Sequence, residues 1–172
     1  MTSCNHKVCR YARQATHNWL YSLMLTWGMA QAICLSTVGS TRFAIRNDGT
    51  QVTDTRTGLV WARCSVGQNW NGSTCSGAYG TFSHEDASTY AHNQNGWRLP
   101  NVRELSGLTD PGCKEPAIDD AAFPNTPSVW YWTSTPYIGY SNYAWYVDFQ
   151  YGSVNFSRRN GGFAVRLVRD RL

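Results

Sequence analysis

The chain has 172 residues, of which 15 are basic and 11 acidic, for a formal net charge of +4. This length corresponds to one domain. Lys7, Arg10 and Arg13 lie in the first 32 residues, so the rest of the chain carries 12 basic against 11 acidic residues. Nucleic-acid-binding domains usually have a marked basic surplus that displaces counterions, so this near balance argues against a nucleic-acid partner.

The first 32 residues are typical of a secretory signal peptide. Three basic residues precede a mostly apolar run, residues 19–32, which ends in the small-x-small pattern Ala30-Gln31-Ala32. The run is shorter than the roughly 20 residues that a membrane-spanning helix needs, and polar residues interrupt it. We therefore expect an exported protein (periplasmic, cell-surface or secreted) with no stable membrane span after processing. The predicted division is a leader at 1–32, a short segment at 33–40 and one domain at 41–172, and an uncleaved anchor is the alternative.

Strands are predicted at both ends of the remaining chain. Asn47-Asp48-Gly49 is a hairpin signal, because these residues favour the tight turn between two strands. The predicted strands are residues 43–45, 51–53 and 59–61, and strands resume at Ser128 after an irregular segment, residues 116–127.

Two helices are predicted between these strand regions. Ser83 is a good N-cap for a helix that continues to about residue 93. Asn101 caps a second helix, with an acidic residue in the capping-box position and leucines facing the core before residues 110–112 end it. His84 and Glu85 fall in the first turn of the first helix, where we expect surface residues rather than acid/base catalysts.

Four cysteines follow the predicted leader: Cys34, Cys64, Cys75 and Cys113. An even number of cysteines in an exported chain indicates disulfides. A Cys64–Cys75 bridge is favoured, because it closes a short loop rich in Gly, Asn and Ser that has little core of its own. Cys34–Cys113 then follows by elimination. A zinc site is the alternative, but the spacing lacks a C-x-x-C pair, so we expect no metal.

The last forty residues combine apolar positions with side chains suited to binding. The apolar positions predict a buried frame: Trp130, Trp132, Trp145, Val147, Phe149, Val154, Val165 and Leu167. Trp61 and Trp97 are assigned to the same core. A β-rich core with merely solvated outer strands is the alternative interpretation.

Between the frame positions lie Tyr, Asn, Ser and Arg, the mixture found on binding surfaces, where Tyr gives contact area and Arg a charged fork. From Ser128 onward five arginines accompany two aspartates, so a local positive patch that favours an anionic partner is expected. The predicted ligand-binding residues are Tyr137, Tyr140, Asn142, Tyr143, Asp148, Gln150, Tyr151, Ser153, Asn155, Arg158, Arg159 and Asn160.

No catalytic constellation is recognisable in the sequence. The sequence identifies no histidine as the general base for Ser134 or Ser157, and no Gly-x-Ser-x-Gly nucleophile elbow occurs. Asp119 and Asp120 point to different sides of an extended chain, which weakens a glycosidase interpretation. We therefore expect a protein without catalytic activity or cofactor.

Six segments in fixed order carry a family resemblance: VTDTRTGLVWARC, GWRLPNVREL, PAIDDAAFPNTP, YWTSTPY, AWYVDFQYGSV and VRLVR. Over residues 41–169 the chain resembles the C-terminal domain family of collagen-like bacterial adhesins, Lcl_C. The resemblance implies an α+β, C-type-lectin-like fold, β-rich with two helices and disulfide-stabilised. Formylglycine-generating enzymes and the variable proteins of diversity-generating retroelements share this fold. The usual calcium-binding triplets of C-type lectins are absent, so no calcium-dependent sugar site is expected.

The resemblance also implies a function. In such folds the C-terminal strands and loops display a ligand surface, members near the adhesin bind sulfated polysaccharides, and retroelement-linked members carry Tyr, Asn and Ser at diversified positions. We therefore expect an exported, non-catalytic adhesin or receptor-like domain that binds a surface protein or an anionic glycan, and diversification of its gene is a hypothesis. A structural envelope or surface-assembly domain is the alternative, and an enzyme of formylglycine-generating type is less favoured.

Overall fold

Residues 41–171 are the part of the chain that the computed structural model describes, so the predicted signal peptide at 1–32 and the segment 33–40 lie outside it. Its elements are β1 (Phe43–Ile45), β2 (Gln51–Asp54), β3 (Val60–Ala62), β4 (Asn69–Trp70), β5 (Cys75–Ser76), α1 (His84–His92), α2 (Val102–Ser106), β6 (Trp130–Pro136), β7 (Tyr143–Asp148), β8 (Ser153–Arg158) and β9 (Val168–Arg169). The α+β class with two helices is confirmed.

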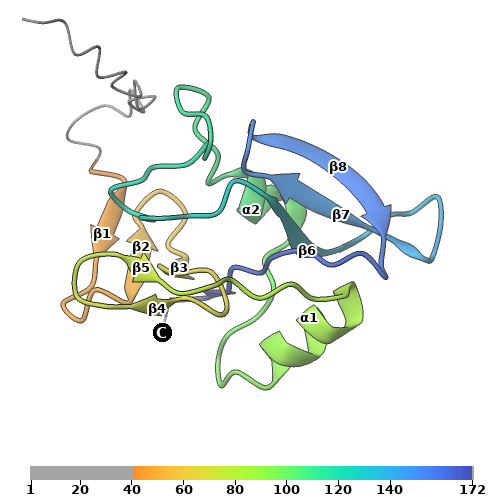
Figure 1. The fold of residues 1–172 in the computed structure, drawn as a ribbon, viewed down its shortest axis with the longest axis horizontal. Helices are drawn as coiled ribbons and strands as arrows, with labels where there is room; N and C mark the ends of the chain where they lie inside the picture. Colours follow the sequence, from red (N-terminus) through yellow and green to blue (C-terminus); the bar gives the residue numbers. More distant parts are fainter. Residues whose placement is uncertain (1–40, 172) are drawn as a thin grey trace, which may run out of the picture. The chain divides into compact units, whose positions relative to one another are not determined.

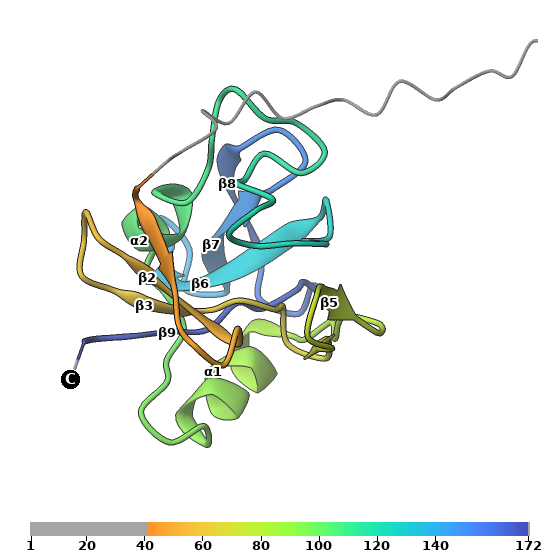
Figure 2. The same cartoon turned by 90° about the vertical axis from the view of Figure 1, so that its left-hand side faces the viewer.

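Two antiparallel sheets organise these elements (Figure 1). One sheet has four strands in the order β1-β2-β3-β9, so the last strand of the chain lies against β3 (Figure 2). The other sheet has three strands in the order β6-β7-β8, which leaves β8 at an edge. The short pair β4–β5, which the sequence analysis did not predict, stands apart from both sheets.

The predicted hairpin at residues 47–49 connects β1 to β2. The Asp48 carboxylate accepts a hydrogen bond from the backbone N–H of Thr50 at 3.0 Å, and this bond lowers the pKa of Asp48. Gly49 has a φ of +70°, and a Cβ there would lie 2.5 Å from Nε1 of Trp70. Only glycine satisfies both conditions at this position.

Both helices begin where their caps predict. The Ser83 hydroxyl accepts from the backbone N–H of Asp86 in α1, which ends at the C-cap Asn93. Asn101 and Glu104 form a reciprocal capping box in α2. The second helix is shorter than predicted, because Gly107 is its C-cap and Leu108, although buried, lies beyond it.

Strand β6 is buried on both of its faces. Tyr131 packs with Val147 and the leucines of the α2 region in one core cluster. Trp132 packs with Tyr146 and Phe163 in a second cluster, on the α1 side of the sheet. The three-stranded sheet therefore separates two apolar clusters, and consecutive residues of β6 belong to different cores.

This double burial corrects part of the predicted frame. Trp130 and Val154 were expected in the core but are 45% and 41% exposed, whereas Tyr131 and Tyr146 are buried. The predicted alternation with one buried face fails in two ways: the middle of β6 is covered on both sides, so Tyr131 is buried as well, and the edge strand β8 is exposed on both sides, so Val154 is not buried. Most of the other assigned core residues are buried: Trp61, Trp132, Val147, Phe149, Val165 and Leu167. Trp97 and Trp145 are only half-buried.

A buried arginine joins the end of β3 to the segment before β6. The side chain of Arg166 is fully buried, and its guanidinium donates to the carbonyl oxygens of Ala62 and Arg63 and, at 2.8 Å, to the hydroxyl of Thr126. It also lies 4.9 Å from the centre of the Phe123 ring. Burial lowers the pKa of Arg166, since desolvation disfavours its charged form. Carbonyl and hydroxyl oxygens surround this cation in place of a carboxylate.

The predicted Cys64–Cys75 disulfide is present and joins the end of β3 to β5. Cys113 is buried and disulfide-bonded. Its predicted partner, Cys34, lies outside the described residues, so that pairing stays a prediction.

We expect Arg166→Met to lower the free energy of unfolding by about 2–4 kcal/mol, because it leaves buried carbonyl and hydroxyl acceptors without a donor. Urea unfolding measures this loss. Arg103→Met, at an exposed position of α2, is the control and should change stability by less than about 0.5 kcal/mol. Equal small losses in both variants would contradict a structural role for the buried guanidinium.

Candidate ligand-binding surface

The edge strand β8 and the segments that flank it carry most of the predicted ligand-binding residues. β8 pairs only with β7 among the described strands, in a register that matches Tyr143 with Arg158 and Asp148 with Ser153. Five of its six residues are exposed. The hairpin therefore has two ends, one at residues 142–143 and 158–160, the other at the turn 149–152.

The first end carries an aromatic cluster, defined here as Tyr137, Tyr140, Tyr143, Trp145 and Phe156. The rings of Tyr137 and Phe156 stack with centroids 4.0 Å apart, and those of Tyr140 and Tyr143 lie 5.6 Å apart. Tyr140 is 64% exposed, whereas Tyr137, Tyr143 and Trp145 are half-buried. Aromatic rings thus form a partly exposed surface at this end of the sheet.

Alternation along β7 explains where this surface comes from. Tyr143 and Trp145 lie on the same side of the strand as Val147, which is fully buried in the cluster that contains Leu105 of α2. The side of the sheet that faces α2 is therefore fully buried near Val147 and carries partly exposed aromatic rings farther along β7. Trp145 was expected in the core, and Phe156 was not among the predicted binding residues.

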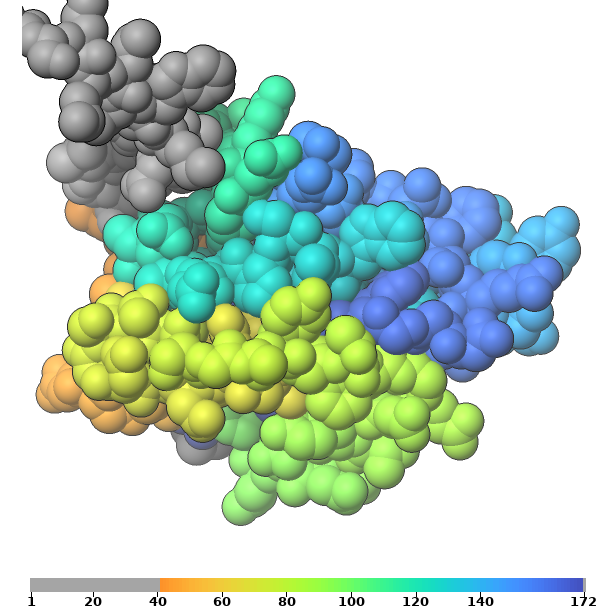
Figure 3. Space-filling view, in the orientation of Figure 1, coloured from red at the N-terminus to blue at the C-terminus, as the bar shows by residue number. Residues whose placement is uncertain are grey.

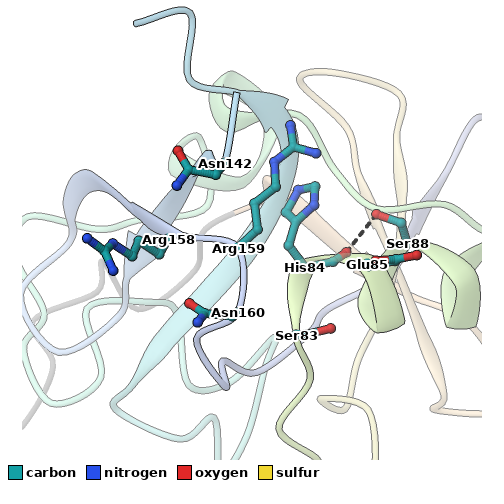
Figure 4. A pocket seen from close by; sticks show the side chains of 8 residues that line it. All are labelled: Ser83, His84, Glu85, Ser88, Asn142, Arg158, Arg159 and Asn160. Atoms are coloured by element: carbon teal, nitrogen blue, oxygen red, sulfur yellow. Dashed lines mark hydrogen bonds between the residues drawn. The ribbon is translucent and has the colours of Figure 1, made fainter. Parts of the chain in front are cut away.

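A polar pocket of about 620 Å³ lies beside the same end of the hairpin. In Figure 3 the blue surface of β8 and the residues after it borders the yellow-green surface of α1. The pocket residues come from both segments, as Figure 4 shows: Ser83, His84, Glu85 and Ser88 from the α1 region, and Asn142, Arg158, Arg159 and Asn160 from the hairpin side.

Hydrogen bonds fix both arginines of the polar pocket through their Nε atoms. Arg158 Nε donates to the hydroxyl of Tyr143 at 3.1 Å, and Arg159 Nε donates to the carbonyl oxygen of Tyr143 at 3.3 Å. Within residues 41–171, the terminal Nη atoms of both side chains have no hydrogen-bond partner. Two oriented guanidinium groups therefore remain available to an anionic or polar ligand group.

His84 anchors the α1 side of the pocket. Its backbone N–H donates to the carbonyl oxygen of Arg159 at 2.8 Å, and its Nε2 lies 2.9 Å from the carbonyl oxygen of Thr133. The ring is buried edge-on against Trp132, and this burial lowers the pKa of His84. The expectation that His84 is a surface residue is therefore wrong, whereas Glu85 is exposed as expected. A neutral imidazole donating to Thr133 has a structural role.

The remaining predicted residues lie at the other end of the hairpin or on its other side. Tyr151 is 60% exposed in the β7–β8 turn and Gln150 is half-buried there. Ser153 and Asn155 are exposed, but they pair with Asp148 and Tyr146, on the side of the sheet away from the aromatic cluster. The predicted residues therefore do not form one continuous surface.

Asp148 is placed differently from the prediction. Its side chain is buried, and its carboxylate accepts a hydrogen bond from the backbone N–H of Gln150 at 2.8 Å. This contact gives Asp148 a role in the turn, away from the exposed surface.

The predicted positive patch also divides into separate places. Arg158 and Arg159 line the polar pocket, Arg166 is buried, and Arg169 and Arg171 lie in the region of the four-stranded sheet. The sequence did not indicate the α1 side of the pocket, since residues 83–88 approach the hairpin through long-range contacts such as the hydrogen bond from His84 to Arg159, 75 positions later in the chain.

Within residues 41–171, no group of three or more His, Cys, Asp or Glu side chains is arranged to hold a metal ion. In the same part of the chain, no helix has the length and apolar character needed to cross a membrane.

Comparison with known proteins adds one finding. Residues 50–169 match the family of the Lcl C-terminal domain, which covers more than half of the chain. None of the curated proteins matches the chain. The match includes both sheets from β2 to β9, the Cys64–Cys75 disulfide and the residues of the aromatic cluster and polar pocket. The chain therefore belongs to the Lcl C-terminal domain family.

Proposed function

We propose that this domain is an exported, non-catalytic binding module of adhesin or receptor type that holds its ligand through the aromatic cluster and the adjacent polar pocket. The observation that carries the proposal is the continuation of the α2 side of the sheet into exposed rings, next to two arginines whose Nη atoms have no hydrogen-bond partner within residues 41–171. Aromatic residues and arginine dominate the energetics of protein interfaces.

A surface protein is the favoured ligand class. Stacked tyrosine and phenylalanine rings offer contact area that loses little rotational freedom on binding. The near balance of charge outside the predicted leader supplies little long-range attraction for a polyanion. An anionic glycan is the second candidate, and the two arginines that line the polar pocket, Arg158 and Arg159, favour it.

The disulfide supports two parts of the proposal. A bond between Cys64 and Cys75 fits a protein that matures in an oxidising compartment, which agrees with export. It also removes these two thiols from chemistry of the formylglycine-generating type, which depends on reactive cysteines. The exposure of Tyr140 in the aromatic cluster favours binding over a purely structural envelope role, for which buried tyrosines are expected.

We expect Tyr140→Ala to weaken ligand binding by about 2 kcal/mol, roughly 30-fold, because this ring is the most exposed of the aromatic cluster. A panel of cell-surface proteins, screened by surface plasmon resonance, supplies the ligand. Tyr151→Ala is the matched control, since Tyr151 is similarly exposed at the far end of the hairpin.

The Tyr151→Ala variant should bind as the unmodified chain does. Both variants should unfold within about 0.5 kcal/mol of that chain, which shows that any loss of binding does not come from the fold. A binding loss in Tyr151→Ala with none in Tyr140→Ala would place the contact surface at the turn and contradict the proposal.

Salt dependence distinguishes the two ligand classes. For a protein ligand held by aromatic anchors, we expect affinity to change little with salt and to survive the double change Arg158→Gln/Arg159→Gln in large part. An anionic glycan predicts the reverse, because charges are screened over about 8 Å at physiological ionic strength. Binding to a heparin-like polymer and to the protein panel at two salt concentrations is the measurement. Polymer binding at physiological salt that falls steeply as salt rises and disappears in the double variant would favour the glycan.

A further inference from the structure

A second concentration of positive charge lies on the other sheet, in a hollow of about 300 Å³ lined by Arg46, Val60, Arg169 and Arg171. We refer to it as the basic hollow. Arg46 follows β1, Val60 lies in β3, Arg169 in β9, and Arg171 two residues after it. Figure 2 shows β9 beside β3 in this sheet. Segments from both ends of the described chain therefore meet at one place.

Strand register explains why these side chains share a side of the sheet. Val60 of β3 pairs with Arg169 of β9 on one side and with Thr53 of β2 on the other. Val52 and Val168, which directly precede Thr53 and Arg169 in their strands, point to the opposite side of the sheet and are fully buried in the core. The arginine side chains thus lie on the outer side of the sheet. Val60 is buried although it lies on that side, so it forms the apolar floor of the hollow.

One of the three guanidinium groups is held in place before any ligand arrives. Arg169 Nη2 donates to Oε1 of Gln51 at 2.6 Å, and its guanidinium lies 4.8 Å from the centre of the Trp97 ring. An arginine fixed by a hydrogen bond and a ring loses less conformational freedom on binding. Arg46 and Arg171 are exposed at the rim.

Among residues 41–171, no carboxylate side chain lines the basic hollow. Asp170, between two of its arginines in sequence, pairs with Arg98 at 3.1 Å. Asp48 lies near Arg46 and lines a neighbouring hollow, and its carboxylate accepts from the backbone N–H of Thr50. Three like charges therefore converge with their mutual repulsion incompletely neutralised by the protein.

We infer that the basic hollow binds a phosphate group. The planar guanidinium fork matches tetrahedral oxyanions bidentately, and three cations complement the two negative charges of a phosphomonoester better than the single charge of a carboxylate. The volume of the hollow, about 300 Å³, has room for a phosphate group and part of the molecule that carries it. The site lies on different strands from the aromatic cluster and polar pocket, so it is independent of the proposed ligand surface.

Titration calorimetry with inorganic phosphate tests the site, at slightly alkaline pH and with ionic strength held constant by sodium chloride. We expect Arg46→Gln/Arg171→Gln to lose phosphate affinity by about tenfold or more, because two of the three charge-assisted contacts are removed. The matched control is Arg56→Gln/Arg103→Gln, which removes the same charge from exposed side chains outside the hollow. The control should stay within about twofold of the unmodified chain, since screening weakens distant charges.

Three results would overturn the inference: no phosphate binding by the unmodified chain, unchanged affinity in the Arg46→Gln/Arg171→Gln variant, or an equal loss in the control. Acetate, a monoanion, should bind more weakly than phosphate. Equal affinity for the two anions would contradict the inference that the three arginines favour a doubly charged group. Tyr140→Ala should bind phosphate normally, so failure of this site and failure of the proposed function remain distinguishable.

Sedimentation with vesicles distinguishes the sources of the phosphate group. Vesicles that contain phosphatidic acid present a phosphomonoester at a surface, and phosphatidylcholine vesicles are the comparison. Binding that needs Arg46 and Arg171 supports the site and assigns a lipid headgroup. Calorimetric phosphate binding without sedimentation supports the site for a soluble or glycan-linked phosphate.

Discussion

The position of the candidate ligand-binding surface depends on the burial of β6 on both of its faces. Tyr131 belongs to one core cluster and Trp132 to the other, so β6 is fixed from two sides. β7 pairs with this fixed strand, and β8 pairs with β7. The edge strand can therefore expose nearly all of its side chains and still keep one position, which is what a preorganised binding surface requires.

Arginine has three different structural roles in this fold. Arg166 and Arg63 are buried and donate mainly to backbone carbonyl oxygens, and within residues 41–171 they join segments of the chain without a carboxylate partner. Arg169 is held by Gln51 and a tryptophan ring. Arg158 and Arg159 keep their Nη atoms available in the polar pocket. Net charge therefore says little about where this protein can attract an anion, because position and pairing decide it.

The two ends of the β7–β8 hairpin differ in what their chemistry allows. At one end, stacked rings lie on the α2 side of the sheet, and the side chains of Arg158 and Arg159 line the polar pocket beside α1. At the other end, the buried Asp148 carboxylate holds a turn that exposes Tyr151. A ligand that contacted both ends would have to cover the whole edge strand. The end of the hairpin near α1 is better suited to hold a ligand, because the aromatic cluster there supplies apolar area and the polar pocket supplies hydrogen-bonding groups.

The sequence by itself determined the α+β class, the caps of both helices at Ser83 and Asn101, the turn at Gly49 and the Cys64–Cys75 bridge. Each of these depends on residues close together in the chain, where local backbone and capping preferences act. Only the tertiary structure decided which side chains are exposed. It placed Trp130 outside and Tyr131 inside, buried His84 and Asp148, and brought α1 to the hairpin. These outcomes depend on what covers each side of a strand, and that cover comes from residues distant in sequence, which local periodicity does not encode.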